Sequence, residues 1–203
     1  MSRLSRLLIV CAVGLALLGG GLAAMLLYRA PQAIEAARSA AAIGGPFALT
    51  ASDGRTVTDR TYRGKFLLIY FGYTSCPDAC PTALNDIGVA LDRLGPEAAK
   101  VQPIFITVDP RRDTREALAE YLKSFDPRIV ALTGTDEQIA AVAKAYRVYY
   151  ARHDAGGGNY LVDHSSYFYL IDPKGKFVDA MAGDLSGEGI AARIDRFIGK
   201  TDR

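Results

Sequence analysis

The run from Lys65 to Tyr73, KFLLIYFGY, restricts the possible folds more than any other feature of this chain. A strand with one face in water alternates apolar and polar residues, whereas a continuous apolar run bounded by turn signals is typical of a strand buried on both faces. Such a strand belongs to a sheet that is covered on both of its faces. The sequence therefore predicts a layered α/β domain.

The remaining segments supply the layers that such a sheet needs. Apolar residues at helical spacing predict helices at 81–94, 114–124, 136–146 and 190–198, and short apolar runs predict strands at 101–108 and 129–132. Turn residues predict hairpins at 47–59, 149–163 and 167–180. This order predicts a thioredoxin-like mixed sheet flanked by helices.

The N-terminal part predicts a membrane anchor. From Leu7 to Tyr28 no residue is charged, and a helix of that length spans roughly 33 Å, about the hydrocarbon thickness of a bilayer. A cleaved signal peptide is the alternative, but its apolar region is usually only about 7–15 residues long. We therefore expect an anchor at 1–28, a linker rich in Ala at 29–45, and one domain at 46–203.

The charge distribution favours one orientation and argues against one class of partner. Arg3 and Arg6 precede the apolar run while Arg29 and Arg38 follow it, and the positive-inside tendency leans towards a domain outside the cytoplasm. The short leader favours a single-pass protein of the bacterial inner membrane, with its domain in the periplasm, over mitochondrial import. Basic and acidic residues nearly balance in the rest of the chain, so its net charge gives no basis for nucleic-acid binding.

The cysteines divide by location. Cys11 lies inside the apolar run and is expected to be a small lipid-facing or packing residue. Cys76 and Cys80 follow the buried strand, and Pro81 fits the first turn of the next helix, so we expect both thiols in the loop ahead of that helix. A helix N-terminus favours the thiolate, which metal binding and disulfide exchange both require. A structural disulfide is the alternative, but so small a loop would constrain the unfolded chain little.

His164 is the residue that favours a metal site. It stands beside Asp163 where a predicted hairpin strand leads to the strand at Tyr167, a junction that can face the cysteine loop in a thioredoxin-type sheet. Two thiolates and one imidazole suit Cu(I), and an axial or solvent ligand would suit Cu(II). Structural zinc would require a fourth protein ligand, and none is evident. A hydrogen-bonded histidine at a strand end remains the alternative, more strongly so for His153.

Three segments then point to a family. YFGYTSCPDACPTAL at 70–84, TVDPRRDT at 107–114 and YLVDHSSYFYLIDPKGKF at 160–177 resemble the hallmark segments of the Sco/SenC family, in the same order. The resemblance covers about residues 46–198. It implies that Cys76, Cys80 and His164 bind one copper ion per chain, as Cu(I) or Cu(II).

The resemblance also implies a function and its partners. The chain is expected to be a metallochaperone that assists assembly of the dinuclear copper centre of cytochrome c oxidase. Its partners would be the copper-bearing subunit of the oxidase, other periplasmic copper chaperones, and thioredoxin-like reductants. The alternative is a thiol-disulfide oxidoreductase that keeps the recipient's cysteines reduced through a redox disulfide between Cys76 and Cys80. A thiol peroxidase is a more distant third possibility, and no catalytic residue is assigned.

Other residues of these segments have two explanations each. The carboxylates of Asp78 and Asp163 could each lie beside the metal site and orient His164 or a thiolate. Alternatively, Asp78 is an acidic residue at a helix N-terminus and Asp163 is a turn residue at a strand end. Asp109, Arg112 and Asp113 are expected to be architectural, through charge pairing and helix capping. Tyr70, Phe71 and Tyr73 should pack in or beside the core strand, and Tyr73 is close enough in sequence to line the site.

Overall fold

The computed structural model describes residues 43–157 and 159–201. The predicted anchor at 1–28 and nearly all of the predicted linker lie outside these described residues. Within the described part of the chain, no helix combines the length and the apolar character that crossing a membrane requires.

The main sheet has seven strands in the order β2-β1-β5-β4-β3-β8-β9. The central strands β3, β4 and β5 are parallel, while β1 and β8 pair antiparallel with β5 and β3 respectively. The strands are β1 Ala48–Ala51, β2 Thr56–Thr58, β3 Phe66–Gly72, β4 Val101–Thr107, β5 Val130–Thr133, β8 Tyr167–Ile171 and β9 Phe177–Ala182. The mixed sheet predicted from the sequence is therefore confirmed.

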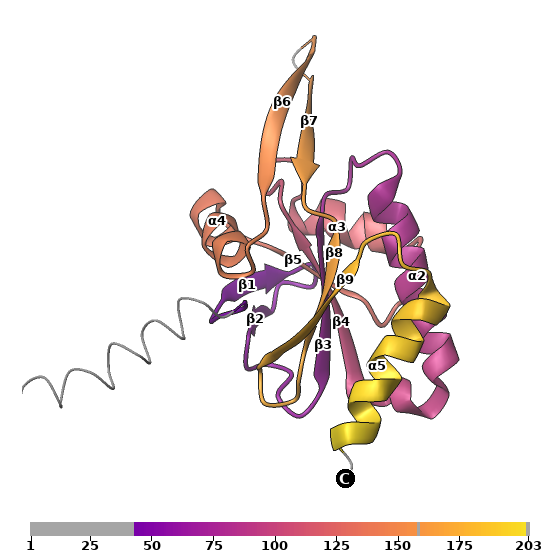
Figure 1. The fold of residues 1–203 in the computed structure, drawn as a ribbon. Helices are drawn as coiled ribbons and strands as arrows, with labels where there is room; N and C mark the ends of the chain where they lie inside the picture. The colour runs from indigo at the N-terminus through magenta and orange to yellow at the C-terminus, as the bar shows by residue number, and fades with distance from the viewer. Residues whose placement is uncertain (1–42, 158, 202–203) are drawn as a thin grey trace, which may run out of the picture. The chain divides into compact units, whose positions relative to one another are not determined.

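Helices cover both faces of this sheet (Figure 1). The helices α2 and α5 lie side by side on one face, and α4 lies on the other. Thr114 caps α3 by accepting a hydrogen bond from the Ala117 N–H, as predicted, and Thr135 and Gln138 form a capping box at the start of α4. The helical elements are α2 Ala79–Leu94, the 3-10 helix η1 Gly95–Lys100, α3 Arg115–Leu122, α4 Asp136–Ala145 and α5 Gly187–Thr201.

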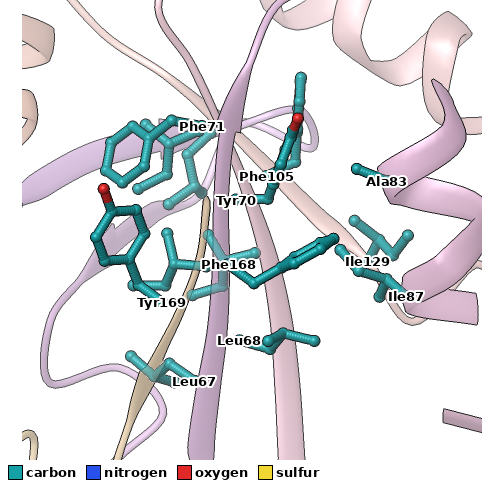
Figure 2. Close-up of a cluster of buried hydrophobic side chains, with 14 of the residues drawn as sticks. Leu67, Leu68, Tyr70, Phe71, Ala83, Ile87, Phe105, Ile129, Phe168 and Tyr169 are labelled. Atoms are coloured by element: carbon teal, nitrogen blue, oxygen red, sulfur yellow. The ribbon is translucent and has the colours of Figure 1, made fainter. Parts of the chain in front are cut away.

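Strand β3 is the centre of the core. Every residue of β3 is buried, as the continuous apolar run predicted. Figure 2 shows Phe71 on one side of β3 with Tyr169, and Phe168 on the other side near Ile87 of α2. The ring centroids of Phe71 and Tyr169 are 5.8 Å apart, and those of Tyr70 and Phe168 are 5.1 Å apart. Aromatic side chains therefore fill the layers on both faces of the strand that leads to the cysteines.

A second, two-stranded sheet stands apart from the first. It consists of β6 Tyr150–Gly156 and β7 Asn159–His164, paired antiparallel as predicted. In Figure 1 this hairpin projects beyond the end of the main sheet at which β3 leads into α2. The last residue of β7, His164, is thus held at the cysteine end of the sheet.

Candidate metal centre

The structure brings the three predicted ligands together. The two sulfur atoms of Cys76 and Cys80 and a ring nitrogen of His164 all lie within 4.8 Å of one another. Cys76 lies in the loop after β3, Cys80 lies in α2, and His164 ends β7. Residues far apart in sequence therefore converge at one end of the sheet.

The position of Cys80 differs from the expected one. The helix begins at Ala79, so Cys80 lies in its first turn and not in the preceding loop. Pro81 is tolerated there because a first-turn N–H has no intrahelical partner to lose. Pro77 disfavours helical backbone at Cys76, which stays in the loop. The two thiols thus come from different local structures.

Gly72, at the end of β3, makes room for one of the thiols. A Cβ atom added to Gly72 would lie 2.7 Å from the Cys80 sulfur and 2.8 Å from an edge carbon of Phe105. The Cys80 side chain is completely buried at this point. This role of Gly72 was not predicted from the sequence, although a glycine inside an apolar strand is a known sign of close approach by another group.

The orientation of His164 leaves one ring nitrogen available to a metal. Its Nδ1 lies 3.0 Å from the carbonyl oxygen of Ser165, and since a carbonyl can only accept, Nδ1 carries the proton. In the neutral ring the other nitrogen, Nε2, then carries the lone pair that a metal needs, and it lies 3.5 Å from the Cys80 sulfur. The rings of Tyr70 and Tyr73 meet the imidazole edge to face, at centroid distances of 6.2 and 5.9 Å. The sequence suggested Tyr73 beside the site but not Tyr70.

The two thiols differ in acidity. The Cys76 sulfur accepts a hydrogen bond from the backbone N–H of Cys80 at 3.4 Å. The neighbouring side chain of Cys80 is the main reason that the pKa of Cys76 is lowered. The backbone N–H groups of Asp78 and Cys80 lower the pKa of Cys76 further. The pKa of Cys80 is raised, because the Cys76 side chain lies beside its thiol and because the thiol is buried. Cys76 is therefore the first of the pair to become a thiolate.

A buried carboxylate holds the cysteine loop in place. Asp113 accepts hydrogen bonds from the backbone N–H of Thr74 at 3.0 Å and from its hydroxyl at 2.6 Å. It also accepts one from the Thr107 hydroxyl, at 2.6 Å, at the end of β4. The architectural role predicted for Asp113 is thus carried by hydrogen bonds from threonines and not by charge pairing. Burial raises the pKa of this carboxyl group.

Neither Asp78 nor Asp163 lies where its carboxylate would orient a metal ligand. Asp78 is exposed and is the N-cap residue of α2, without a capping hydrogen bond from its side chain. The Asp163 carboxylate lies 2.9 Å from Nε2 of His153. Because neighbouring strand residues point to opposite faces, Asp163 faces away from the His164 ring. The structure therefore favours the helix-end position for Asp78 and pairs Asp163 with His153.

Comparison with known proteins identifies the family. The SCO1/SenC family model matches residues 35–199. The chain belongs to the SCO1/SenC family. SCO2 of Saccharomyces cerevisiae, a mitochondrial protein, is 40% identical over 205 residues, which cover 94% of this chain and 68% of that protein. Three further curated relatives are matched over 60%, 42% and 73% of their own length, so some of them are much longer than this chain.

Solved structures of the family share the fold. ScoI of Bradyrhizobium japonicum with copper bound has a TM-score of 0.72 and 46% sequence identity, covering 76% of this chain and 99% of that chain. BsSco, described as a member of the Sco family of cytochrome c oxidase assembly proteins with a disulfide switch, has a TM-score of 0.62 and 25% identity, covering 76% and 92%. The predicted thioredoxin-like fold is therefore confirmed.

This SCO1/SenC site allows two kinds of chemistry. Two thiolates and an unprotonated imidazole nitrogen form a soft donor set that fits a copper ion. Alternatively the two sulfurs, which are both free thiols here, can lose two protons and two electrons to form a disulfide. Either reaction uses both sulfurs, so a disulfide and a bound metal exclude each other.

Proposed function

We propose that this chain binds one copper ion through Cys76, Cys80 and His164 and delivers it to the dinuclear copper centre of cytochrome c oxidase during assembly. The observation that carries this proposal is the convergence of the three ligand atoms within 4.8 Å. It is supported by ScoI of B. japonicum, which was solved with copper bound, and by the description of the Sco family as oxidase assembly proteins.

The burial of the ligands suits a cargo ion. Cys80 is completely buried, whereas Cys76 and His164 are partly exposed. Ligands of a recipient protein can therefore approach the copper from the side of Cys76 and His164 and replace these two first. Cys80 would release the ion last, since it has the least access to solvent. A site enclosed on all sides would retain its metal.

The donor set also predicts how strongly Cu(I) and Cu(II) each depend on His164. Cu(I) accepts two soft thiolates as a sufficient ligand set, whereas Cu(II) gains more from the borderline imidazole nitrogen. His164 is therefore more important for Cu(II) than for Cu(I). Tyr70 and Tyr73 limit the rotation of the imidazole ring through their edge-to-face contacts.

A second function, thiol-disulfide exchange, is favoured by the acidity of Cys76. Its thiolate would attack a disulfide of the recipient, and Cys80 would then displace the recipient's sulfur. The recipient gains two electrons and two protons, and Cys76 and Cys80 become a disulfide that a thioredoxin-like reductant must reduce again. The disulfide switch described for BsSco supports this alternative.

We further propose that residues 1–28 anchor the chain in the bacterial inner membrane, with the linker 29–45 and the domain 46–203 in the periplasm. The charge-free run from Leu7 to Tyr28 supports this location. There the domain would meet the copper-bearing subunit of the oxidase, and also periplasmic copper chaperones and thioredoxin-like reductants.

Oxidase assembly in cells separates the two functions. The experiment expresses wild-type protein or the His164→Ala variant in a bacterium that lacks its own homologue, and measures copper content and activity of the purified oxidase. A chaperone should fail with His164→Ala, because it loses a copper ligand but keeps both thiols. Full assembly by His164→Ala together with failure of Cys76→Ser would contradict copper delivery and favour thiol reduction.

A further inference from the structure

The hairpin that carries His164 depends on contacts with the rest of the domain. Within the described residues, β6 and β7 pair only with each other, and in Figure 1 they project away from the main sheet. An isolated two-stranded hairpin is at best marginally stable in water. Side-chain contacts with the body of the domain must therefore fix its orientation, and with it the position of His164.

Asp109, Arg112 and Tyr160, which we call the Asp109 cluster, make such contacts. The Tyr160 hydroxyl donates to Oδ1 of Asp109 at 2.7 Å. Arg112 donates through Nη1 to the Tyr160 carbonyl oxygen at 2.9 Å, and its guanidinium carbon lies 3.8 Å from the centroid of the Tyr160 ring. Arg112 also donates through Nε to Asp109, which is completely buried. The hydroxyl, ring and backbone of one hairpin residue are thus all held by the loop after β4.

Two routes connect this cluster to the metal centre. Tyr160, Val162 and His164 alternate along β7 and so point to the same face of the hairpin, where Val162 is buried. In addition, the guanidinium carbon of Arg112 lies 5.7 Å from the ring centroid of Tyr73, whose ring meets that of His164. A change in how Tyr160 is held is therefore transmitted to His164 by the strand and by packed side chains.

We propose that the Asp109 cluster positions His164 opposite the two cysteines and thereby sets the affinity for Cu(II) more than that for Cu(I). Both thiols belong to the body of the domain, whereas the imidazole belongs to the hairpin. Loosening the hairpin therefore displaces one ligand and leaves the other two in place. The cluster members are positioning residues, because they act through His164. The metal part of this inference rests on the proposed function.

The test uses Tyr160→Phe in the full-length chain, since this change removes only the hydroxyl. The affinity for Cu(II) should fall about 10- to 100-fold, the usual effect of losing a group that orients a ligand, while Cu(I) affinity stays unchanged. Tyr149→Phe removes an exposed tyrosine hydroxyl at the base of the same hairpin and should alter neither affinity. In a His164→Ala background, Tyr160→Phe should cause no further loss of Cu(II) affinity, because its effect passes through His164.

A measurement without copper separates this inference from the proposed function. Nitrogen NMR of the His164 ring in the reduced, metal-free protein should show Nδ1 protonated in wild type, and signals shifted towards a mixture of tautomers in Tyr160→Phe. Unchanged ring signals in Tyr160→Phe, equal losses of Cu(I) and Cu(II) affinity, or a further loss in the His164→Ala background would overturn the positioning role. Failure of the wild-type chain to bind copper would instead refute the proposed function, and the ring signals would still test the cluster.

Discussion

Gly72→Ala should damage the metal centre without touching any of its ligands. The added Cβ atom would lie 2.7 Å from the Cys80 sulfur and 2.8 Å from Phe105, distances at which one neighbour must move. Overpacking of this kind costs about 1–3 kcal/mol, while replacing a strand glycine by alanine gains roughly 0.5–1 kcal/mol. We therefore expect a net destabilisation of up to about 2.5 kcal/mol.

The displaced group decides the effect on function. Phe105 is completely buried in the core, so the Cys80 sulfur, which can rotate about its Cα–Cβ bond, is expected to move away from Cys76 and His164. Copper affinity should then fall about tenfold or more, as it does when the geometry of a metal site is disturbed. Urea denaturation measures the stability, and competition with a copper chelator measures the affinity.

A control lies in the helix that carries Cys80. A Cβ atom at Gly88 would meet its nearest neighbour, the Cβ of Asp126, at 3.5 Å, an ordinary contact. Gly88→Ala should therefore leave copper binding unchanged and stabilise α2 slightly. If Gly72→Ala bound copper as tightly as Gly88→Ala, the argument that Gly72 makes room for the Cys80 ligand would be refuted.

Two further predictions concern the cysteine pair and the carboxylate of Asp113, which holds the cysteine loop. Iodoacetamide should modify the partly exposed Cys76 before the buried Cys80. Because the pKa of Cys76 is lowered, this preference should persist below the usual thiol pKa of about 8.5. Peptide mass spectrometry measures the labelling of each cysteine, and equal labelling of the two would contradict the prediction. Asp113→Ala should destabilise the fold by about 3 kcal/mol in urea denaturation, because it leaves donors of Thr74 and Thr107 without their acceptor. Burial raises the pKa of Asp113 in the folded chain above its value in the unfolded chain. Between these two pKa values the folded chain binds a proton that the unfolded chain has released, so the free energy of unfolding decreases as pH rises through this interval. Asp113→Asn should remove that loss, and an unchanged pH profile of stability in this variant would contradict the assignment.

Local pattern predicted the elements of the described domain well. The continuous run before the cysteines became the buried strand β3, and Thr114 caps α3 as expected. Such features depend on residues close in sequence, where periodicity and capping chemistry operate. The start of α2 was misplaced because Pro81 fits more than one position of a first helical turn, and the sequence alone does not choose among them.

The centre itself could be predicted only in part. The ligand types and the family resemblance pointed to Cys76, Cys80 and His164, which the structure brings together. The roles of Gly72 and Tyr70 and the hydrogen bonds of Asp113 depend on contacts between elements distant in the chain. Neither periodicity nor spacing contains that information, so these residues became evident only from the fold.

Copper binding by the full-length reduced protein, measured for each oxidation state, is the decisive experiment for the site formed by Cys76, Cys80 and His164. Wild-type protein should bind one copper ion per chain as Cu(I) and as Cu(II), and Cys76→Ser with Cys80→Ser should bind neither. His164→Ala should retain Cu(I) through the two thiolates and lose most of its affinity for Cu(II), because only the imidazole ligand is gone. Equal affinity of His164→Ala and wild type for both ions, or copper binding that survives loss of both cysteines, would contradict the three-ligand site.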